Sequence, residues 1–235
     1  MKTAKISYRD EKTVLEGYYA YDAKIKGKRP VIIVVHDWSG KNEFACKKAD
    51  KLAELGYVGF AIDMFGEGKT GSTKEEKQEL IKPFVNDRDK LKERILTAYE
   101  TAKTLDNADD SRIGAIGFCF GGLCALDLAR SGADVKGVVS FHGLLNSPGK
   151  DTPYIRARIL ALHGYDDPMG KPDQVIAFAD EMTKAKADWE LCMYGNTMHA
   201  FTNPNANDPG FGTVYNKNAD HRSWIAMTEF FRQVF

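Results

Sequence analysis

The feature that most constrains the fold of this chain is the stretch at residues 113–122, IGAIGFCFGG, and the apolar-periodic run that follows it. The stretch predicts a short strand, a sharp turn and the start of a helix. The turn reads Gly117-x-Cys119-x-Gly121, a pattern that places a nucleophile at the tip of a strand–turn–helix unit. Small neighbours allow the helix and the strand to pass closely. We therefore expect Cys119 to have a strained backbone and to project above the edge of a sheet.

A cysteine in this position is a candidate nucleophile. The positive end of the helix macrodipole and the backbone amides of the first turn favour a thiolate over a thiol. The N–H of the next residue, Phe120, is placed to stabilise a developing oxyanion. The alternative is a buried structural cysteine, which is common in protein cores. The motif alone does not decide between these two interpretations.

The length and composition favour one large α/β domain. The chain has 235 residues, enough for a substantial core, and we expect a single domain over residues 1–235. It has 33 basic and 33 acidic residues without a block of like charge, which disfavours nucleic acid and membrane surfaces as partners. Four scattered cysteines, no apolar signal segment and no long apolar run predict a cytoplasmic protein.

Strands and helices alternate along the chain after an N-terminal hairpin. Residues 1–30 alternate apolar and polar side chains and predict an antiparallel hairpin that turns at 10–12. The β-branched run at 31–35 is typical of a strand buried on both faces. Besides the central unit, we expect strands at 57–62, 135–141, 158–162 and 189–194, helices at 43–55, 75–82, 86–105, 173–187 and the C-terminus, and loops around Pro148 and Pro153 and over 202–216. This order predicts a mostly parallel, twisted sheet with helices on both faces.

Reactive residues follow several of the predicted strands, where ligands bind in an open parallel sheet. The strand ends carry His36-Asp37-Trp38, Cys119, Asp166-Asp167 and His199. A cysteine nucleophile needs a histidine base, and that base needs a carboxylate to orient it. We expect one of the two aspartates to serve Cys119 and His199, and the other to start a turn before a proline.

The other histidines and Asp63 are expected to be structural. His36 is expected to donate to a backbone carbonyl and to shape its turn. His142 and His163 lack a charged partner in the sequence, and His221 is expected to lie away from the site. Asp63 is expected to organise the loop after its strand. No metal-ligand spacing is present, so no metal site is predicted.

Five motifs, taken together and in order, resemble those of the dienelactone hydrolase family, a cysteine-using branch of the α/β-hydrolases. The motifs are VVHDWSG at 34–40, LAELGYVGFAIDMFGEG at 52–68, IGFCFGG at 116–122, LHGYDDP at 162–168 and HAFTNP at 199–204. The resemblance extends from about residue 10 to the C-terminus. It implies the α/β-hydrolase fold and a carboxylic ester hydrolase of the carboxymethylenebutenolidase type.

The resemblance also assigns a catalytic triad. It implies that Cys119 is the nucleophile and His199 the base. Between the two aspartates it favours Asp167 over Asp166 as the acid.

The resemblance further assigns the groups around the nucleophile. It implies that the backbone N–H groups of Trp38 and Phe120 form the oxyanion hole. The family places a glutamate immediately before the first of these residues, where it helps the thiol to ionise. Asp37, which is one methylene shorter, stands at that position and is the corresponding candidate for thiol activation.

The predicted pocket differs from that of the dienelactone-cleaving members. These resemble each other in having an arginine four residues after the catalytic histidine, where this sequence has Asn203. Arg88 is a candidate cation for the substrate, with a solvated arginine at a helix start as the alternative. Phe118, Met198 and Phe201 are candidate substrate-binding residues of a mainly apolar pocket.

The sequence therefore predicts a hydrolase that cleaves a small ester or lactone through a thioester intermediate. It requires no cofactor, and its partner is a small-molecule substrate, with the protein a monomer or a homodimer. One alternative is a thiol sensor or binding protein on a hydrolase scaffold, in which Cys119 is oxidised rather than acylated. Another is an acyl-transfer or peptide-cleaving enzyme with the same triad.

Overall fold

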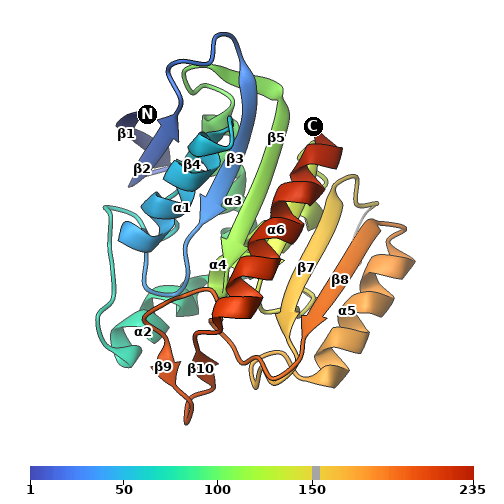
Figure 1. Ribbon diagram of the computed structural model, residues 1–235. Helices are drawn as coiled ribbons and strands as arrows, with labels where there is room; N and C mark the ends of the chain where they lie inside the picture. The colour runs from blue at the N-terminus through green and yellow to red at the C-terminus, as the bar shows by residue number, and fades with distance from the viewer. Residues whose placement is uncertain (150–153) are drawn as a thin grey trace. The chain divides into compact units, whose positions relative to one another are not determined.

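The computed structural model begins with the antiparallel hairpin expected from the sequence, formed by β1 (Lys2–Asp10) and β2 (Thr13–Tyr21). The structure describes residues 1–149 and 154–235, so the loop position Pro153 lies outside the described residues. Two units follow from the contacts within the chain, Met1–Ile116 and Gly117–Phe235 (Figure 1). The assignment of residues 1–235 to a single domain stays a prediction.

The first unit contains β1, β2, β4 and β3, in that order in the sheet, and most of β5 (Ala108–Phe118). β3 (Arg29–Val35) runs parallel to β4 (Val58–Ala61), and β2 runs antiparallel to β4. Every residue of β3 is buried, as its β-branched composition predicts. The helices of this unit are α1 (Glu43–Glu54), α2 (Lys74–Val85) and α3 (Arg88–Ala102). Asn42 caps α1 by accepting hydrogen bonds from two first-turn amides.

The expectation that the helix at 75–82 ends before Pro83 is wrong. α2 begins after its cap, Thr73, and continues through Pro83 to Val85. Proline in a helix removes one backbone hydrogen bond. Here the last turn is retained because Phe84 is buried and its ring packs 6.1 Å from that of Phe65. Burial of one aromatic ring thus offsets the local cost of the proline.

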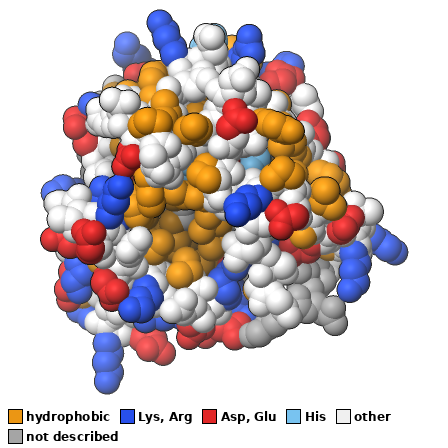
Figure 2. All heavy atoms as spheres, turned by 90° about the horizontal axis from the view of Figure 1, so that it is seen from below, with side chains coloured by type: hydrophobic (Ala, Val, Ile, Leu, Met, Phe, Trp, Pro, Cys, Tyr) orange, Lys and Arg blue, Asp and Glu red, His pale blue; other side chains and the backbone are white. Residues whose placement is uncertain are grey.

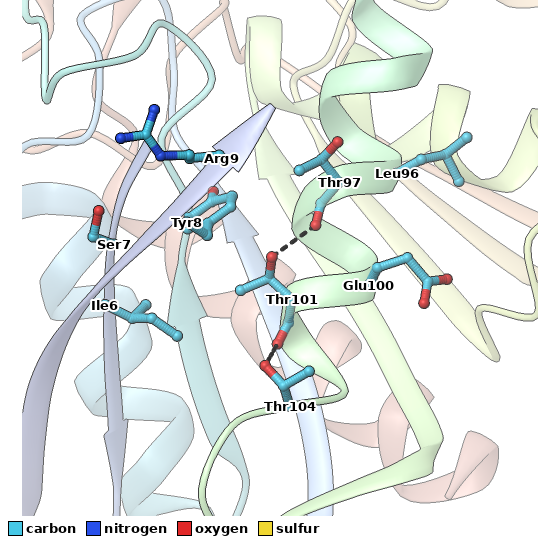
Figure 3. Close-up of a pocket in the computed structure, with 9 residues that line it drawn as sticks. All are labelled: Ile6, Ser7, Tyr8, Arg9, Leu96, Thr97, Glu100, Thr101 and Thr104. Atoms are coloured by element: carbon cyan, nitrogen blue, oxygen red, sulfur yellow. Dashed lines mark hydrogen bonds between the residues drawn. The ribbon is translucent and has the colours of Figure 1, made fainter. Parts of the chain in front are cut away.

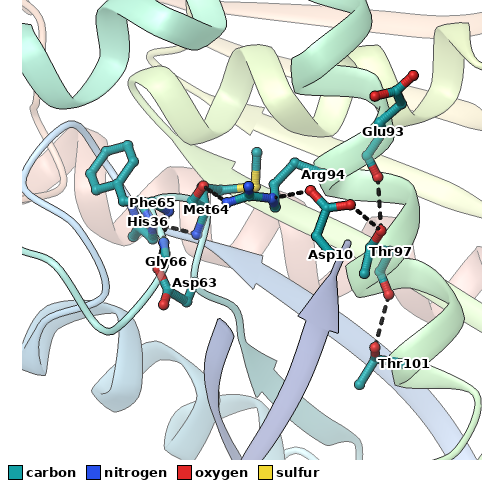
Figure 4. A network of polar contacts seen from close by, with 10 residues as sticks. All are labelled: Asp10, His36, Asp63, Met64, Phe65, Gly66, Glu93, Arg94, Thr97 and Thr101. Carbon is teal, nitrogen blue, oxygen red and sulfur yellow. Dashed lines mark hydrogen bonds and ion pairs between the residues drawn. The ribbon is translucent and has the colours of Figure 1, made fainter. Parts of the chain in front are cut away.

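A polar network joins the loop after β4 to α3 in the first unit (Figure 4). Arg94 donates to the backbone carbonyl of Met64 at 2.7 Å and forms an ion pair with Asp10. Met64 N donates to Nε2 of His36 at 3.2 Å, and Nδ1 of His36 lies 2.6 Å from the carbonyl oxygen of Asp37. Because Nε2 accepts, Nδ1 carries the proton, and full burial lowers the pKa of His36. This confirms the structural interpretation of His36.

Asp63 organises the loop that follows β4, as expected. Its buried carboxylate accepts hydrogen bonds from the amides of Phe65, Gly66 and Gly68 at 2.9–3.0 Å. It also accepts one from Glu16 N at 3.2 Å. Each carboxylate oxygen is therefore satisfied within the loop and the hairpin.

The second unit contains three parallel strands in the order β6-β7-β8. Its elements are the end of β5 (Ala108–Phe118), α4 (Phe120–Arg130), β6 (Gly137–Phe141), β7 (Arg158–Gly164), α5 (Pro172–Lys184), β8 (Asp188–Tyr194), β9 (Asn207–Asp208), β10 (Thr213–Val214) and α6 (Lys217–Val234). α6 lies along β6 and β7 (Figure 1). The segment expected as a plain loop at 202–216 contains the short antiparallel pair β9 and β10.

An ion network buried in the second unit fastens α4 to α5. Arg130 forms two hydrogen bonds with the carboxylate of Glu181, at 2.9 and 2.7 Å. A third bond joins it to Asp127 at 3.1 Å and a fourth to the carbonyl of Leu145 at 3.2 Å. These hydrogen bonds and ion pairs offset the free-energy cost of burying the charged guanidinium of Arg130.

Charged side chains of both signs are mixed over the face shown in Figure 2, in keeping with the equal numbers of acidic and basic residues. Within residues 1–149 and 154–235, none of the helices combines the length and the apolar character that crossing a bilayer requires.

Candidate active site

Cys119 stands at the turn between β5 and α4 with a left-handed backbone. Its φ is 55° and its ψ is −117°, a conformation that costs a non-glycine residue about 1–3 kcal/mol. The turn is held because Cys119 N donates to the carbonyl oxygen of Phe141 at 3.0 Å, and the Cys119 carbonyl accepts from Gly122 N at 2.9 Å. The side chain is partly exposed. These features match the expected position of a nucleophile.

The glycines around Cys119 are required by close backbone contacts. A Cβ at Gly117 would overlap the carbonyl group of Gly121. A Cβ at Gly122 would come 2.7 Å from the Cα of Gly143. Glycine at both positions therefore lets α4 start directly over the strand ends.

Phe120 is the first residue of α4. The N–H groups in the first turn of a helix point towards its N-terminus and carry the positive end of the macrodipole. Cys119 immediately precedes this turn, so a negative sulfur there lies in a favourable field. The same field would stabilise an oxyanion beside the sulfur.

Asp167 and His199 form a buried hydrogen-bonded pair. Nδ1 of His199 lies 2.7 Å from Oδ2 of Asp167, and the two residues are only 2% and 3% exposed. The other carboxylate oxygen of Asp167 accepts from Met169 N at 2.8 Å. Asp167 therefore both orients the histidine and stabilises the turn, roles that the sequence divided between two aspartates. Asp166 is exposed.

The electrostatic environment of His199 links it to Cys119. Burial would lower the pKa of His199, but the negative charge of Cys119 and the hydrogen bond to Asp167 raise it to about 10. Nε2 of His199 is buried and has no hydrogen bond of standard geometry among residues 1–149 and 154–235. His199 is therefore hydrogen-bonded to Asp167 through Nδ1 and interacts electrostatically with Cys119.

Aromatic rings pack around His199. His142 lies 5.1 Å from it in an edge-to-face arrangement, and Phe201 lies 5.0 Å from His142. His142 also bonds Thr202 through Nε2 at 2.8 Å. Phe118 stacks 4.8 Å from Phe141. Two candidate substrate-binding residues, Phe118 and Phe201, are 0% exposed, so the structure gives them a packing role and their contact with substrate stays a prediction.

Met198 lies in a cavity of about 340 Å³ in the second unit. The cavity is also lined by Asp166, Asn196, Val214 and Asn216. Met198 is therefore partly accessible, in contrast to Phe201, although its contact with a substrate stays a prediction.

The candidate residues of the first unit lie in the turn after β3 and at the start of α3. Asp37 accepts from Ser39 N at 2.8 Å, and Trp38 follows it in the turn after β3. The ammonium group of Lys77 lies 5.5 Å from the centre of the Trp38 ring. Arg88 is the first residue of α3, directly after the cap Asp87, as the helix-start alternative predicts. The roles of Trp38, Asp37 and Arg88 towards substrate or thiol stay predictions.

A separate open cavity of about 580 Å³ lies between β1 and α3, lined among others by Tyr8, Thr97 and Thr101 (Figure 3). Two of its threonine hydroxyls bond backbone carbonyls, since Thr101 donates to Thr97 O and Thr104 donates to Thr101 O, each at 2.8 Å. The polar side chains of Ser7, Arg9 and Glu100 also line this cavity. In the described part of the chain, no three His, Cys, Asp or Glu side chains are grouped to hold a metal ion.

The sequence reasoning missed Asn216, which bonds the loop that carries His199. Its amide donates to Thr197 Oγ1 at 3.0 Å, and its backbone N–H donates to Phe201 O at 3.1 Å. The position of asparagine directly before an apolar helical period could have identified it as a helix cap. The bonds to Thr197 and Phe201 depend on tertiary structure.

The element order, the turn at Cys119 and the Asp167–His199 pair define an α/β-hydrolase fold. The chain belongs to the dienelactone hydrolase family, whose sequence profile matches residues 15–235. This is a family of hydrolases that act on carboxylic esters and lactones.

Three relatives illustrate the match. A Bradyrhizobium protein named as a probable 2-oxo-3-(5-oxofuran-2-ylidene)propanoate lactonase is 30% identical over 214 residues, 85% of each chain. The crystal structure of a dienelactone hydrolase-like promiscuous phosphotriesterase from metagenomic libraries is 34% identical, with a TM-score of 0.94 over 100% of this chain and 98% of the other. A solved structure named m3DLH is 35% identical, with a TM-score of 0.96 over 100% of this chain and 98% of the other.

Proposed function

We propose that this protein hydrolyses small carboxylic esters or lactones with Cys119 as nucleophile, His199 as base and Asp167 as the orienting acid. The observation that carries the proposal is the position of His199, bonded to Asp167 at 2.7 Å and coupled by charge to Cys119. An imidazolium beside a thiolate is the state in which cysteine attacks a carbonyl without prior proton transfer. Membership of the family supports the same class of reaction.

The reaction has two halves. The Cys119 thiolate attacks the carbonyl carbon and forms a C–S bond, and the carbonyl electrons move to oxygen. The oxyanion collapses, the C–O bond to the leaving group breaks, and the His199 imidazolium protonates the departing alkoxide. Neutral His199 then takes a proton from water as the water attacks the thioester. The acid product leaves, and the thiolate and imidazolium are restored.

The Phe120 N–H, at the positive end of α4, is the proposed donor to the oxyanion in this unit. One such donor is worth about 3 kcal/mol of transition-state stabilisation. The assignments of Trp38 N–H as a second donor, and of Asp37 as an aid to thiol ionisation, rest on the family resemblance. The cytoplasmic location likewise stays a prediction.

The test is a covalent adduct on Cys119. Reaction with p-nitrophenyl acetate followed by rapid acid quench is expected to give a protein whose mass has increased by one acetyl group, located on the peptide that contains Cys119. Cys119→Ala is expected to lose the adduct and the turnover, whereas Cys192→Ala, which removes an exposed cysteine, is expected to keep both. A wild-type protein without adduct or burst would contradict the proposal and favour the thiol sensor. Turnover of an anilide at a rate similar to the ester would favour a peptide-cleaving enzyme.

A second activity is hydrolysis of phosphotriesters, which the 34% identity to a promiscuous phosphotriesterase favours. The thiolate would attack phosphorus, form a P–S bond and expel an aryloxide, and water would then cleave the P–S bond. Release of p-nitrophenolate from a diethyl p-nitrophenyl phosphate by the wild type, and its loss in Cys119→Ala, tests this activity. Equal release by both proteins would contradict it.

A further inference from the structure

A strap of chain at residues 212–216 runs beside the segment that carries His199. His199 N donates to the carbonyl of Gly212 at 3.0 Å, and Val214 N donates to the carbonyl of His199 at 3.1 Å. Further along the strap, Asn216 N donates to Phe201 O at 3.1 Å. The backbone of the histidine is therefore fixed on both sides by one short segment.

Asn216 uses its side chain in two directions. Its Oδ1 accepts from Asn218 N and Ala219 N, both at 3.1 Å, and so caps α6. Its Nδ2 donates to Thr197 Oγ1 at 3.0 Å and to Asn196 O at 3.3 Å. The side-chain amide of Asn216 thus joins the start of α6 to residues 196–197, which lead into His199.

The loop that carries Asp167 contacts the loop that carries His199 at Thr197. Thr197 is 1% exposed, and its carbonyl accepts from Asp166 N at 3.0 Å. A Cβ at Gly164 would overlap this carbonyl, so the two loops are in close backbone contact. A displacement of Thr197 would therefore change the spacing between Asp167 and His199.

α6 is a firm anchor for Asn216. Met227, Phe230 and Phe231 are buried along one of its faces. Phe230 packs so closely on β6 that a Cβ at Gly137 would come 2.8 Å from its ring. Fully buried side chains of this size each contribute about 2 kcal/mol, so the helix does not shift easily.

We infer that Asn216 is a positioning residue for the reaction, which holds His199 at hydrogen-bond distance from Asp167 by fixing Thr197 against α6. This inference rests on the proposed function of His199 as the base. The side chain of Asn216 bonds Thr197, Asn196 and the first turn of α6, and its contribution is the alignment of the acid and the base. Small misplacements of a catalytic group reduce rates strongly, because the reacting geometry is narrow.

The test removes the Nδ2 donor of Asn216 and keeps a side-chain oxygen that can cap α6. Asn216→Asp retains the oxygen that caps α6 and loses both Nδ2 donations, and Asn216→Ser does the same without adding charge. Both variants are expected to lower kcat for p-nitrophenyl acetate about tenfold with an unchanged KM. Asn42→Asp is the matched control, since Asn42 caps α1 through the same two kinds of bond. Its kcat is expected to equal that of the wild type.

A second readout does not depend on turnover. The proton on Nδ1 of His199 is expected to give a low-field ¹H resonance in the wild type and in Asn42→Asp. In both Asn216 variants this resonance is expected to broaden through faster exchange with water. An unchanged resonance and an unchanged kcat would overturn the inference. A wild type that shows the resonance and no ester hydrolysis would instead overturn only the proposed function.

Thr197→Val tests the route through Thr197. If Asn216 acts through this hydroxyl, the double variant Asn216→Ser/Thr197→Val is expected to lose no more kcat than the more impaired single variant. Multiplicative losses would show that the two residues act independently, and would contradict this route.

Discussion

Asp167 and His199 lie 32 positions apart in the sequence, and the carboxylate of one accepts the Nδ1 proton of the other at 2.7 Å. The second oxygen of Asp167 is occupied by Met169 N. The carboxylate is therefore oriented by its own turn before it orients the histidine, which fixes both the tautomer and the plane of the ring.

Asp167→Asn should keep the shape of the turn and lose the charge. The amide can still accept from Met169 N, but it stabilises neither the imidazolium nor the correct tautomer. We expect kcat to fall on the order of 10³-fold with little change in the folded structure. Steady-state kinetics together with circular dichroism measures both. Asp166→Asn, at an exposed neighbouring position, is expected to keep wild-type kcat, and equal losses in the two variants would contradict the assignment.

The pKa of His199 should depend on Cys119. Burial opposes protonation of the ring, and the negative charge of Cys119 is the largest effect that raises the pKa to about 10. In Cys119→Ala this charge is absent, so we expect the pKa of His199 to fall. NMR titration of the imidazole resonances in the two proteins measures the change. An unchanged titration midpoint would mean that the sulfur does not carry charge beside the ring.

The same shift predicts a dependence of stability on pH. Because the folded pKa of His199 is raised above its ordinary value of 6.5 to about 10, protonation of the ring stabilises the folded state. This contribution is complete below pH 6.5 and is lost as the pH rises through about 10. The difference in the free energy of unfolding between the wild type and Cys119→Ala, measured in urea, should therefore shrink over this interval. A difference that grows with pH would contradict the sign.

Gly117→Ala should destabilise the turn at the nucleophile. The added Cβ would meet the backbone of Gly121, which cannot move aside as a flexible side chain could. We expect a loss of about 1–3 kcal/mol in the free energy of unfolding. Gly195→Ala is the control, because its Cβ would meet nothing within 4 Å, and it should change stability by less than about 0.5 kcal/mol. Equal melting temperatures of the two variants would contradict the close contact.

Glu181→Ala should be costly because it leaves Arg130 under-compensated in a buried site. Arg130 and Glu181 side chains are 4% and 12% exposed, and the loss of one buried ionic partner costs about 3 kcal/mol. Glu229→Ala removes the carboxylate of another Arg–Glu pair with two hydrogen bonds, which is exposed on α6. We expect no measurable change in Tm there. Thermal melts of both variants compare the buried pair with the exposed one.

Local patterns were sufficient for most of the fold. The alternation at residues 1–30 predicted the hairpin, and the run at 31–35 predicted a strand buried throughout. The prediction failed at Pro83, where the rule against proline in a helix is overridden by the burial of Phe84. That packing is tertiary, and no local pattern contains it.

In the candidate site, too, local features were predictable from the sequence and features set by tertiary packing were not. The motif around Cys119 predicted the strained turn, because the steric demands of such a turn are local. The sequence did not predict that Asp167 both orients His199 and stabilises its own turn. This double role depends on which carboxylate faces a loop 32 positions away in the chain. Phe118 and Phe201 were expected beside a substrate and are fully buried, because aromatic residues next to a site serve its packing as often as its lining.

The left-handed backbone at Cys119 has a consequence for changes in this chain over time. Any residue with a Cβ pays a conformational cost at that position, and glycine does not. A selection for heat resistance alone would therefore favour glycine there and would remove the sulfur in the same step. Cysteine at this turn therefore carries a cost in stability that glycine would avoid.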